Sequence, residues 1–315
     1  MIHTPICDLL GIKYPVFQGG MAWIADGELA AAVSNGGGLG IIAGGNAPAE
    51  AVRAEIQKAK SLTDKPFGVN VMLMSPYADD VAAMLVEERV PVVTTGAGNP
   101  SKYMKAWKGV GMKVIPVVAS ATMGKLMQRV GADAVIAEGG ESGGHVGELT
   151  TMVLVPLVVD AVKIPVIAAG GIADGRGVAA SFMLGACGVQ MGTRFLSAFE
   201  CNVHPDYKAR ILKAGDLCTM VTGKRLGHPV RSLRTPFAQE YSKREYNSNI
   251  SDEELEAFAV GSLRKAAKEG NGQEGSFLSG QIAAMVKKEE SAADIVRSVI
   301  EEAEVVLGGY NKWIK

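Results

Sequence analysis

The chain has 315 residues, of which 48% are hydrophobic and 21% are charged, and its formal net charge is −1. This composition is typical of a globular protein with a large core, and the near-neutral charge argues against nucleic acid and membrane surfaces as partners. The 4 cysteines are widely spaced and form no C-x-x-C pair, so in a chain of this length they indicate reduced thiols and not a zinc site or a disulfide framework. The start of the chain has no signal-peptide pattern, and the longest apolar run, residues 152–162, is too short to span a bilayer. We therefore expect a cytoplasmic protein.

Short apolar runs alternate with segments of helical composition as far as Met191. The apolar runs predict strands at Pro15–Gln18, Leu39–Ala43, Phe67–Leu73, Pro91–Thr95, Lys113–Ala119, Ala134–Ala137, Pro165–Ala169 and Gly188–Met191. The intervening segments predict helices at Asp26–Ser34, Pro48–Lys60, Tyr77–Glu88, Ser101–Lys108, Thr122–Val130, Thr150–Val162 and Gly175–Leu184. Strict alternation implies parallel strands, and eight such units close into an α/β fold of the (β/α)8 TIM barrel type. A doubly wound open sheet is the alternative.

The texture of the sequence changes after Phe199. Charged and polar residues are frequent from Glu200 to Glu274, where Ser251 and Glu254 form the capping-box pattern that begins a helix. We predict a barrel built from residues 1–199 and 275–315, with a small, mostly helical inserted substrate-binding subdomain at 200–274. A last amphipathic helix, at about Ala292–Val306, is expected to return and pack on the barrel.

The loop after the sixth predicted strand contains five glycines and one histidine, His145, between Glu138 and Thr151. Glycine removes steric bulk, so this backbone can lie against a flat or charged ligand, and a histidine can exchange a proton near neutral pH. A flexible turn with an incidental imidazole is the alternative interpretation, and this loop alone does not decide between the two.

The loops after the last two predicted strands contain Gly170-Gly171 and Gly192-Thr193. In a (β/α)8 barrel these loops are the usual phosphate site, where backbone N–H groups and a helix N-terminus face the anion. Glycines of tight turns would give the same pattern. Because such glycines follow both of the last two strands, we favour a phosphorylated cofactor or substrate.

The sequence lacks the residues that several other kinds of enzyme would need. No predicted strand ends at a lysine, as a Schiff-base enzyme would need, and no G-x-S-x-G elbow is present. Glu141, His145 and Glu148 lie in a glycine-rich loop and not on one helix face, which disfavours a catalytic metal. Residues 96–101 resemble a dinucleotide fingerprint but lack its third glycine. A phosphate-bearing planar cofactor remains, and flavin mononucleotide (FMN) fits, with its phosphate near Gly171, Gly192 and Thr193.

At these residues the resemblance to a known family becomes specific. The chain resembles the FMN-dependent enoyl-acyl-carrier-protein reductase II family, within the nitronate monooxygenase (2-nitropropane dioxygenase) superfamily. The stretches that carry the resemblance are Pro15–Trp23, Lys65–Asn70, Val92–Tyr103, Ile115–Ser120, Ala134–Met152, Ile164–Gly177, Val189–Phe195 and Ser279–Ala283.

The resemblance implies that NADH or NADPH reduces FMN, which passes hydride to the β-carbon of a trans-2-enoyl thioester of fatty acid synthesis, while His145 assists protonation. It implies FMN contacts at Gly20, Met21, Ala22, Asn70, Glu138, Gly170, Gly171, Gln190, Met191, Gly192, Thr193 and Gln281. It also implies that the substrate is attached to an acyl carrier protein and that the protein forms a homodimer. It implies a monovalent cation as well, whose ligands the sequence does not identify.

Two other functions stay open. A nitronate monooxygenase would use the same barrel, with FMN and His145, to oxidise alkyl nitronates with O2, and a flavin-binding protein without turnover would show the same motifs. Because a carrier protein is acidic, the basic segment Lys224–Arg234 is a candidate docking face, although a solvated basic loop has the same composition.

Overall fold

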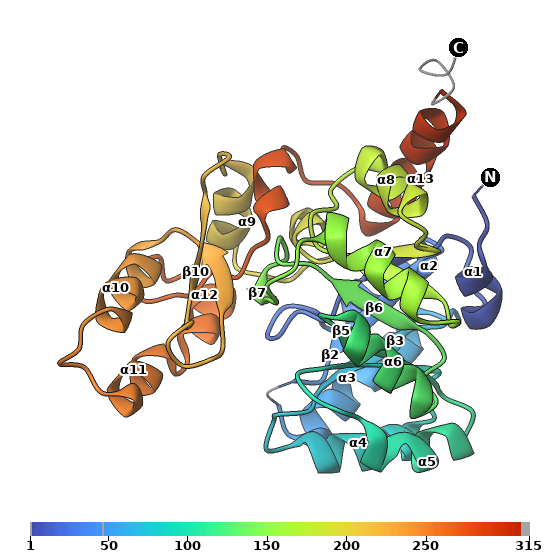
Figure 1. The fold of residues 1–315 in the computed structure, drawn as a ribbon, viewed down its shortest axis with the longest axis horizontal. Coiled ribbons are helices and arrows are strands. Elements are labelled where there is room, and N and C mark those ends of the chain that lie inside the picture. The colour runs from blue at the N-terminus through green and yellow to red at the C-terminus, as the bar shows by residue number, and fades with distance from the viewer. Residues whose placement is uncertain (1, 46, 310–315) are drawn as a thin grey trace.

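The computed structural model describes residues 2–45 and 47–309 and shows a closed barrel of eight parallel strands (Figure 1). The first strand pairs with both its successor and the last strand, so the barrel fold is confirmed and the open sheet is ruled out. Each strand agrees with its prediction to within one residue at either end: β1 Val16–Gln18, β2 Leu39–Ala43, β3 Gly68–Met72, β4 Val92–Gly96, β5 Lys113–Val118, β6 Val135–Glu138, β8 Val166–Ala169 and β9 Gly188–Met191.

Helices cover the outside of the barrel in the predicted order: α2 Gly27–Asn35, α3 Ala49–Leu62, α4 Ala78–Glu88, α5 Ser101–Gly109, α6 Ala121–Arg129, α7 Thr151–Ala161 and α8 Gly175–Met183. After β9 the chain forms the short 3-10 helix η1 (Thr193–Ser197), and the place between α8 and α2 is filled by α13 (Ala292–Gly308). The predicted return of the last helix to the barrel is therefore confirmed (Figure 1).

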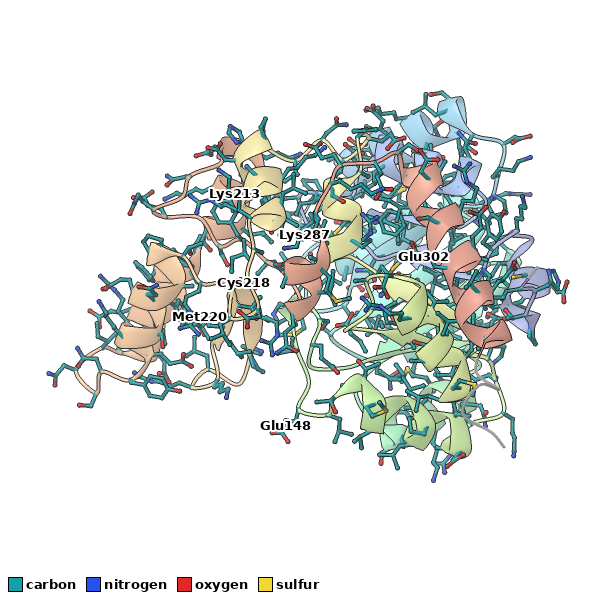
Figure 2. The ribbon with its side chains drawn as sticks, turned by 90° about the horizontal axis from the view of Figure 1, so that it is seen from above. Glu148, Lys213, Cys218, Met220, Lys287 and Glu302 are labelled. Carbon is teal, nitrogen blue, oxygen red and sulfur yellow. The ribbon has the colours of Figure 1, made fainter. Side chains whose placement is uncertain are left out.

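The crossing of α8 and α13 depends on Gly175. A Cβ atom at this position would lie 2.2 Å from Cβ of Glu302 on α13, so the two helices can approach this closely only at a glycine. The Gly175 N–H donates a hydrogen bond of 2.9 Å to the Glu302 carboxylate, and Figure 2 labels Glu302 where the two helices meet. Packing against α8 thus holds the C-terminal helix on the barrel.

Side chains alternate strictly between the inside and the outside of the barrel, because the strand register preserves the period of two around the closed sheet. The inward side chains form one buried cluster that includes Phe17, Leu39, Ile41, Val92, Ile115, Ile136 and Ile167. The short helix α1 (Pro5–Leu10), which was not predicted, adds Ile6 and Leu10 to this cluster. Its 6 residues are too few to show a helical period.

Residues 200–274 form helices, as predicted, together with a hairpin that was not predicted. The helices are α9 Pro205–Leu212, α10 Pro236–Glu245, α11 Asp252–Ala259 and α12 Ser262–Glu269, and the capping box of Ser251 and Glu254 begins α11. The hairpin strands are β10 Thr219–Thr222 and β11 Val230–Leu233. Each strand has only 4 residues and mixes polar with apolar side chains, so neither forms the continuous apolar run by which the barrel strands were predicted.

The hairpin joins this inserted region to the barrel. β11 pairs on one side with β10 and on the other with β7 (Gly144–His145), a short strand in the loop after β6. Figure 1 shows the inserted helices on one side of the molecule, with β7 between them and the barrel. The exact division of the chain at residues 199 and 275 stays a prediction, and Asn46 and residues 310–315 lie outside the described residues.

The close contact of β2 with α2 yields a stability prediction. A Cβ atom at Gly40 would lie 1.9 Å from the backbone oxygen of Ala30, so Gly40→Ala should lower the free energy of unfolding by roughly 1–3 kcal/mol through overpacking. The matched control is Gly109→Ala at the end of α5, where an added Cβ atom would meet nothing within 4 Å apart from its chain neighbours and the backbone of its own helix. There the free energy of unfolding should stay unchanged or rise by up to about 1 kcal/mol. Urea denaturation measures both, and equal stabilities would contradict the contact.

Candidate active site

The last inward-pointing residues of the strands form the floor of the barrel mouth. The register places Asn70, Thr94, Glu138 and Gln190 in this layer. The Thr94 hydroxyl donates a hydrogen bond of 2.8 Å to Oδ1 of Asn70. Within the described part of the chain, the NH2 group of Asn70 and the side-chain amide of Gln190 make no hydrogen bond. Both amides are therefore available to a ligand in the mouth.

Glu138 gives this floor a carboxyl group that is neutral for much of the time. Burial raises the pKa of Glu138 to about 7, and the nearby Ser142 hydroxyl acts in the opposite direction. The Ser142 Oγ atom is itself buried and lies outside hydrogen-bonding geometry with every described residue. A carboxyl group that is protonated near neutral pH can donate a hydrogen bond and does not repel an anionic ligand.

The loops after β8 and β9 lie side by side, because Ala169 pairs with Gln190 in the ladder. Gly170 and Gly171 adopt the left-handed region, with φ of 90° and 74°. Within the described ranges, the backbone N–H groups of Gly171, Gly192 and Thr193 donate no hydrogen bond. Unpaired N–H groups at adjacent glycine-rich turns fit a phosphate group.

The N-terminus of α8, the helix that follows Gly170-Gly171, is occupied by carboxylates of the protein. The Asp174 carboxylate accepts hydrogen bonds from the N–H groups of Arg176 and Gly177, and Glu302 accepts from that of Gly175. Carboxylates thus already neutralise the exposed N–H groups at this helix end. The helix N-terminus at the predicted anion site is instead that of η1, which begins at Thr193 with Gly192 as its N-cap.

The loop after β1 closes one side of the mouth. A Cβ atom at Gly20 would lie 2.5 Å from Cβ of Asn70, so this glycine allows the loop to pack directly on the floor. The side chain of Met21 lies against Gly192, and Ala22 follows it in a half-buried turn. Loops from β1, β3 and β9, distant in sequence, therefore meet here.

The loop containing residues 278–281 closes the opposite side. The Gly280 N–H donates a hydrogen bond of 2.8 Å to Oγ1 of Thr193, and the Gln281 N–H donates one of 2.9 Å to the backbone oxygen of Glu141. The Glu141 carboxylate in turn accepts from the N–H of Thr151 at the start of α7. These contacts place Gln281 beside the predicted anion site, although it comes from a segment 80 or more residues later in the chain.

His145 lies on β7, where it pairs with Val230 of β11, and the neighbouring Val146 N–H donates to the backbone oxygen of Pro229 at 3.0 Å. The side chain of His145 is exposed. Desolvation by the surrounding protein lowers the pKa of His145, and the charge of His228 lowers it further. His145 is therefore mostly neutral at pH 7.

The predicted residues do not all lie on one surface. Met191 has the opposite alternation to Gln190, so its side chain packs among the buried residues between barrel and helices, and its backbone oxygen accepts from the Gly19 N–H. Within the described residues, His145 makes no hydrogen bond to any of the predicted cofactor-binding residues. Its place relative to them is set by the loop that carries it.

The basic segment Lys224–Arg234 is divided by the structure. The Arg231 guanidinium donates hydrogen bonds to the backbone oxygen of Gly140, and Arg225 forms an ion pair of 2.8 Å with Asp252. Lys224 and Arg234 are exposed and form no ion pair with a described residue.

Sequence reasoning missed Thr94, Glu141, Thr151 and His228 as parts of the site. The sequence could have indicated Thr94, because the period of two along β4 points its side chain into the barrel, as the same period on β3 does for Asn70. His228 and the roles of Glu141 and Thr151 depend on contacts between distant segments, which no local pattern indicates.

Within the described residues no three histidine, cysteine, aspartate or glutamate side chains are grouped so that they could hold a metal ion. In the same part of the chain, none of the helices has the length and apolar character needed to cross a bilayer.

The closed barrel of eight parallel strands defines a (β/α)8-barrel protein, and most of the residues predicted to bind a ligand lie at the carboxyl ends of its strands. Comparison with known proteins identifies its family. Residues 3–302 match the nitronate monooxygenase family. The chain therefore belongs to the nitronate monooxygenase family and is an oxidoreductase of that family.

Individual relatives differ in what their names say. The chain is 50% identical to FabK from Thermotoga maritima, with a TM-score of 0.97 and 100% of both chains covered. It is 34% identical to a probable nitronate monooxygenase of Staphylococcus saprophyticus, over 97% of this chain and 99% of the relative. It is 42% identical to (3aS,4S,5R,7aS)-5-hydroxy-7a-methyl-1-oxo-octahydro-1H-indene-4-carboxyl-CoA dehydrogenase of Mycobacterium tuberculosis, over 76% of this chain and 68% of the relative.

The two histidines of the hairpin region give a prediction about pH. Replacing His228 with glutamine removes a positive charge, so the pKa of His145 should rise; it should stay below 6.5 because the desolvation remains. An NMR titration of the imidazole Cε1–H signals measures this pKa in both proteins. An unchanged or lower His145 pKa in the variant would show that His228 does not act on it.

Proposed function

We propose that this protein is an FMN-dependent enoyl-acyl-carrier-protein reductase that reduces trans-2-enoyl thioesters with NADH or NADPH. The observation that carries the proposal is the likeness to FabK, the reductase of this branch, at 50% identity over the whole of both chains. The named relative that acts on a carboxyl-CoA compound supports a thioester substrate. When bound, FMN would supply the carrier that passes a hydride from the nicotinamide to the β-carbon of the substrate.

The residues present fit such a cofactor. The unpaired N–H groups of Gly171, Gly192 and Thr193 would hold its phosphate. The free amides of Asn70 and Gln190 and the carboxyl group of Glu138 would contact its polar ring edge from the floor. These groups come from different strands, and the rigid barrel holds them without help from the ligand.

His145 would supply a proton at the α-carbon or at the thioester oxygen. Its exposed side faces solvent, and its lowered pKa means that the protonated form becomes scarcer as the pH rises above that pKa. A reductase that uses His145 as its acid should therefore lose activity as the pH rises through this range.

Nitronate monooxygenase activity is the second candidate, favoured by the family match over residues 3–302 and by the Staphylococcus saprophyticus relative. There His145 would act as a base that removes the α-proton of a nitroalkane. The neutral imidazole is the active form of a base, so turnover of the neutral nitroalkane should rise with pH through the same range. The nitronate has already lost this proton and does not need the base.

One set of assays tests the proposal. The purified protein is reconstituted with FMN and its visible spectrum is recorded. NADH and NADPH oxidation is then followed with crotonyl thioester, and oxygen uptake is followed with an alkyl nitronate. Thioester-dependent oxidation of the nicotinamide supports the reductase; oxygen uptake on nitronate without it supports the monooxygenase. A yellow protein without turnover would support a flavin-binding protein, and a protein that refuses FMN would refute the cofactor assignment.

Removing the imidazole should separate cofactor binding from catalysis. His145→Ala should retain FMN, because His145 makes no hydrogen bond to the proposed cofactor-binding residues that the structure describes. Enoyl reduction should fall by about 10²–10⁴-fold, the usual worth of general acid–base assistance. Flavin absorbance and steady-state kcat measure the two properties. If His145→Ala turned over near the wild-type rate, His145 would not be the acid–base residue.

We further propose that an acidic acyl carrier protein docks on Lys224 and Arg234, the two basic side chains of the segment that are exposed and without an ion pair in the described chain. Charge reversal at both should raise KM for the carrier-bound substrate at low salt and leave KM for a free pantetheine thioester unchanged. Equal KM values for the carrier-bound substrate in variant and wild type would refute this docking face. The resemblance also suggests a homodimer and a monovalent cation.

A further inference from the structure

The loop that carries His145 has few internal contacts that would fix its conformation. Its five glycines between Glu138 and Thr151 give the backbone a wide choice of conformations. Within the loop, the Gly140 N–H donates to the backbone oxygen of Leu149 at 2.8 Å, and the Ser142 N–H donates to that of Gly139 at 3.1 Å. These bonds close the base of the loop, but they do not orient the part that contains His145.

Contacts with β11 orient that part. Gly144 pairs with Arg231 and His145 pairs with Val230 in an antiparallel ladder of two residues. A ladder this short is weak by itself, since an isolated strand pair is marginal in water. A further interaction is needed to hold it in register.

Arg231 supplies this interaction through its side chain. Nε and Nη2 donate hydrogen bonds of 3.1 and 2.9 Å to the backbone oxygen of Gly140, and Nη1 donates one of 3.1 Å to Oγ1 of Thr219 on β10. The side chain is half-buried, and this burial lowers the pKa of Arg231, while the nearby carboxylate of Glu141 acts in the opposite direction. One planar guanidinium thus connects both hairpin strands to the histidine loop, which the single ammonium group of a lysine could not do.

The same loop is tied to the predicted anion site on its other side. The Glu141 carboxylate accepts from the N–H of Thr151, and the Thr151 hydroxyl lies within 2.9 Å of that carboxylate and of the backbone oxygen of Gly170. The loop is therefore held between the hairpin and the glycines after β8. A change at the hairpin end can alter where His145 lies above the mouth.

We propose that Arg231 is a positioning residue that places His145 over the barrel mouth through its bidentate contact with Gly140, an inference that rests on the proposed role of His145. Arg231 was expected to belong to the carrier-docking face. Its guanidinium instead faces inward and binds the backbone of the histidine loop. Replacing Arg231 should therefore slow the step that uses His145 and leave binding of a carrier protein unchanged.

The test uses the FMN-loaded protein and three variants. Arg231→Met keeps a side chain of similar length without donors, and Arg231→Lys keeps the charge with one donor group. The matched control is Arg264→Met in α12, an exposed arginine of the same inserted region that pairs with Glu269 at 2.6 Å. Stopped-flow absorbance follows reduction of the bound flavin by NADH and its reoxidation by crotonyl thioester. Hydrogen–deuterium exchange follows peptides that cover residues 139–149.

Arg231→Met should slow reoxidation by the thioester by roughly 10- to 100-fold, as expected when hydrogen bonds of a charged group are lost. Reduction by NADH should be unchanged, exchange should become faster in residues 139–149 and not in the barrel strands, and Arg231→Lys should recover part of the rate. Arg264→Met should match the wild type in all measurements. As the loop releases His145, the pH midpoint of reoxidation should move up toward 6.5, the value of an unburied histidine.

Wild-type exchange in the loop together with a wild-type reoxidation rate in Arg231→Met would overturn the proposal. So would loss of FMN from both Arg231 variants, because the residue would then serve the fold as a whole. If the wild-type protein itself does not react with the thioester, the reductase function fails separately. The positioning role is then decided by the exchange data and by the turnover of the neutral nitroalkane, whose α-proton His145 would remove.

Discussion

The closure of β1 onto β9 is the constraint on which the rest of this structure depends. Because Phe17 pairs with Gln190 and with Leu39, the inside–outside alternation is preserved around the whole barrel. Asn70, Glu138 and Gln190, which are separated by many residues in the sequence, therefore point into one floor layer. Below them the same alternation buries an apolar interior that α1 covers at the other end. A shift of one residue in β3, β4, β6 or β9 would turn a polar floor residue outward into the helical layer.

Above the floor, rigidity decreases and the site relies on contacts between loops. The glycines that let the loops lie close to a ligand also leave them without conformations of their own. The structure compensates with bonds that cross between distant segments: Gly280 to Thr193, Gln281 to Glu141, and Arg231 to Gly140. The inserted hairpin is thus part of the site, because it pairs with the strand that carries His145.

One arrangement of this kind can serve two chemistries of the family. The floor amides and the anion cradle would hold the same cofactor in a reductase and in a monooxygenase, and they do not distinguish the substrates. Under the two proposed functions, the difference would lie in the direction in which His145 moves a proton. Desolvation and the charge of His228 favour the neutral imidazole, so the pH dependence of each reaction reports which form of His145 it uses.

The sequence by itself determined the barrel, its strands, the return of the last helix and the glycine loops at strand ends. These features follow from local composition and from periods of two and 3.6 residues, which act over a few neighbouring positions. Only the tertiary structure decided that Asp174 and Glu302 close the N-terminus of α8, that Met191 faces away from the mouth, and that Arg231 turns inward. The sequence likewise did not predict the hairpin β10–β11, because its strands are defined by pairing with each other and with β7. Hydrogen bonds between segments far apart in the chain depend on where the folded backbone places both partners, and no local pattern contains that information.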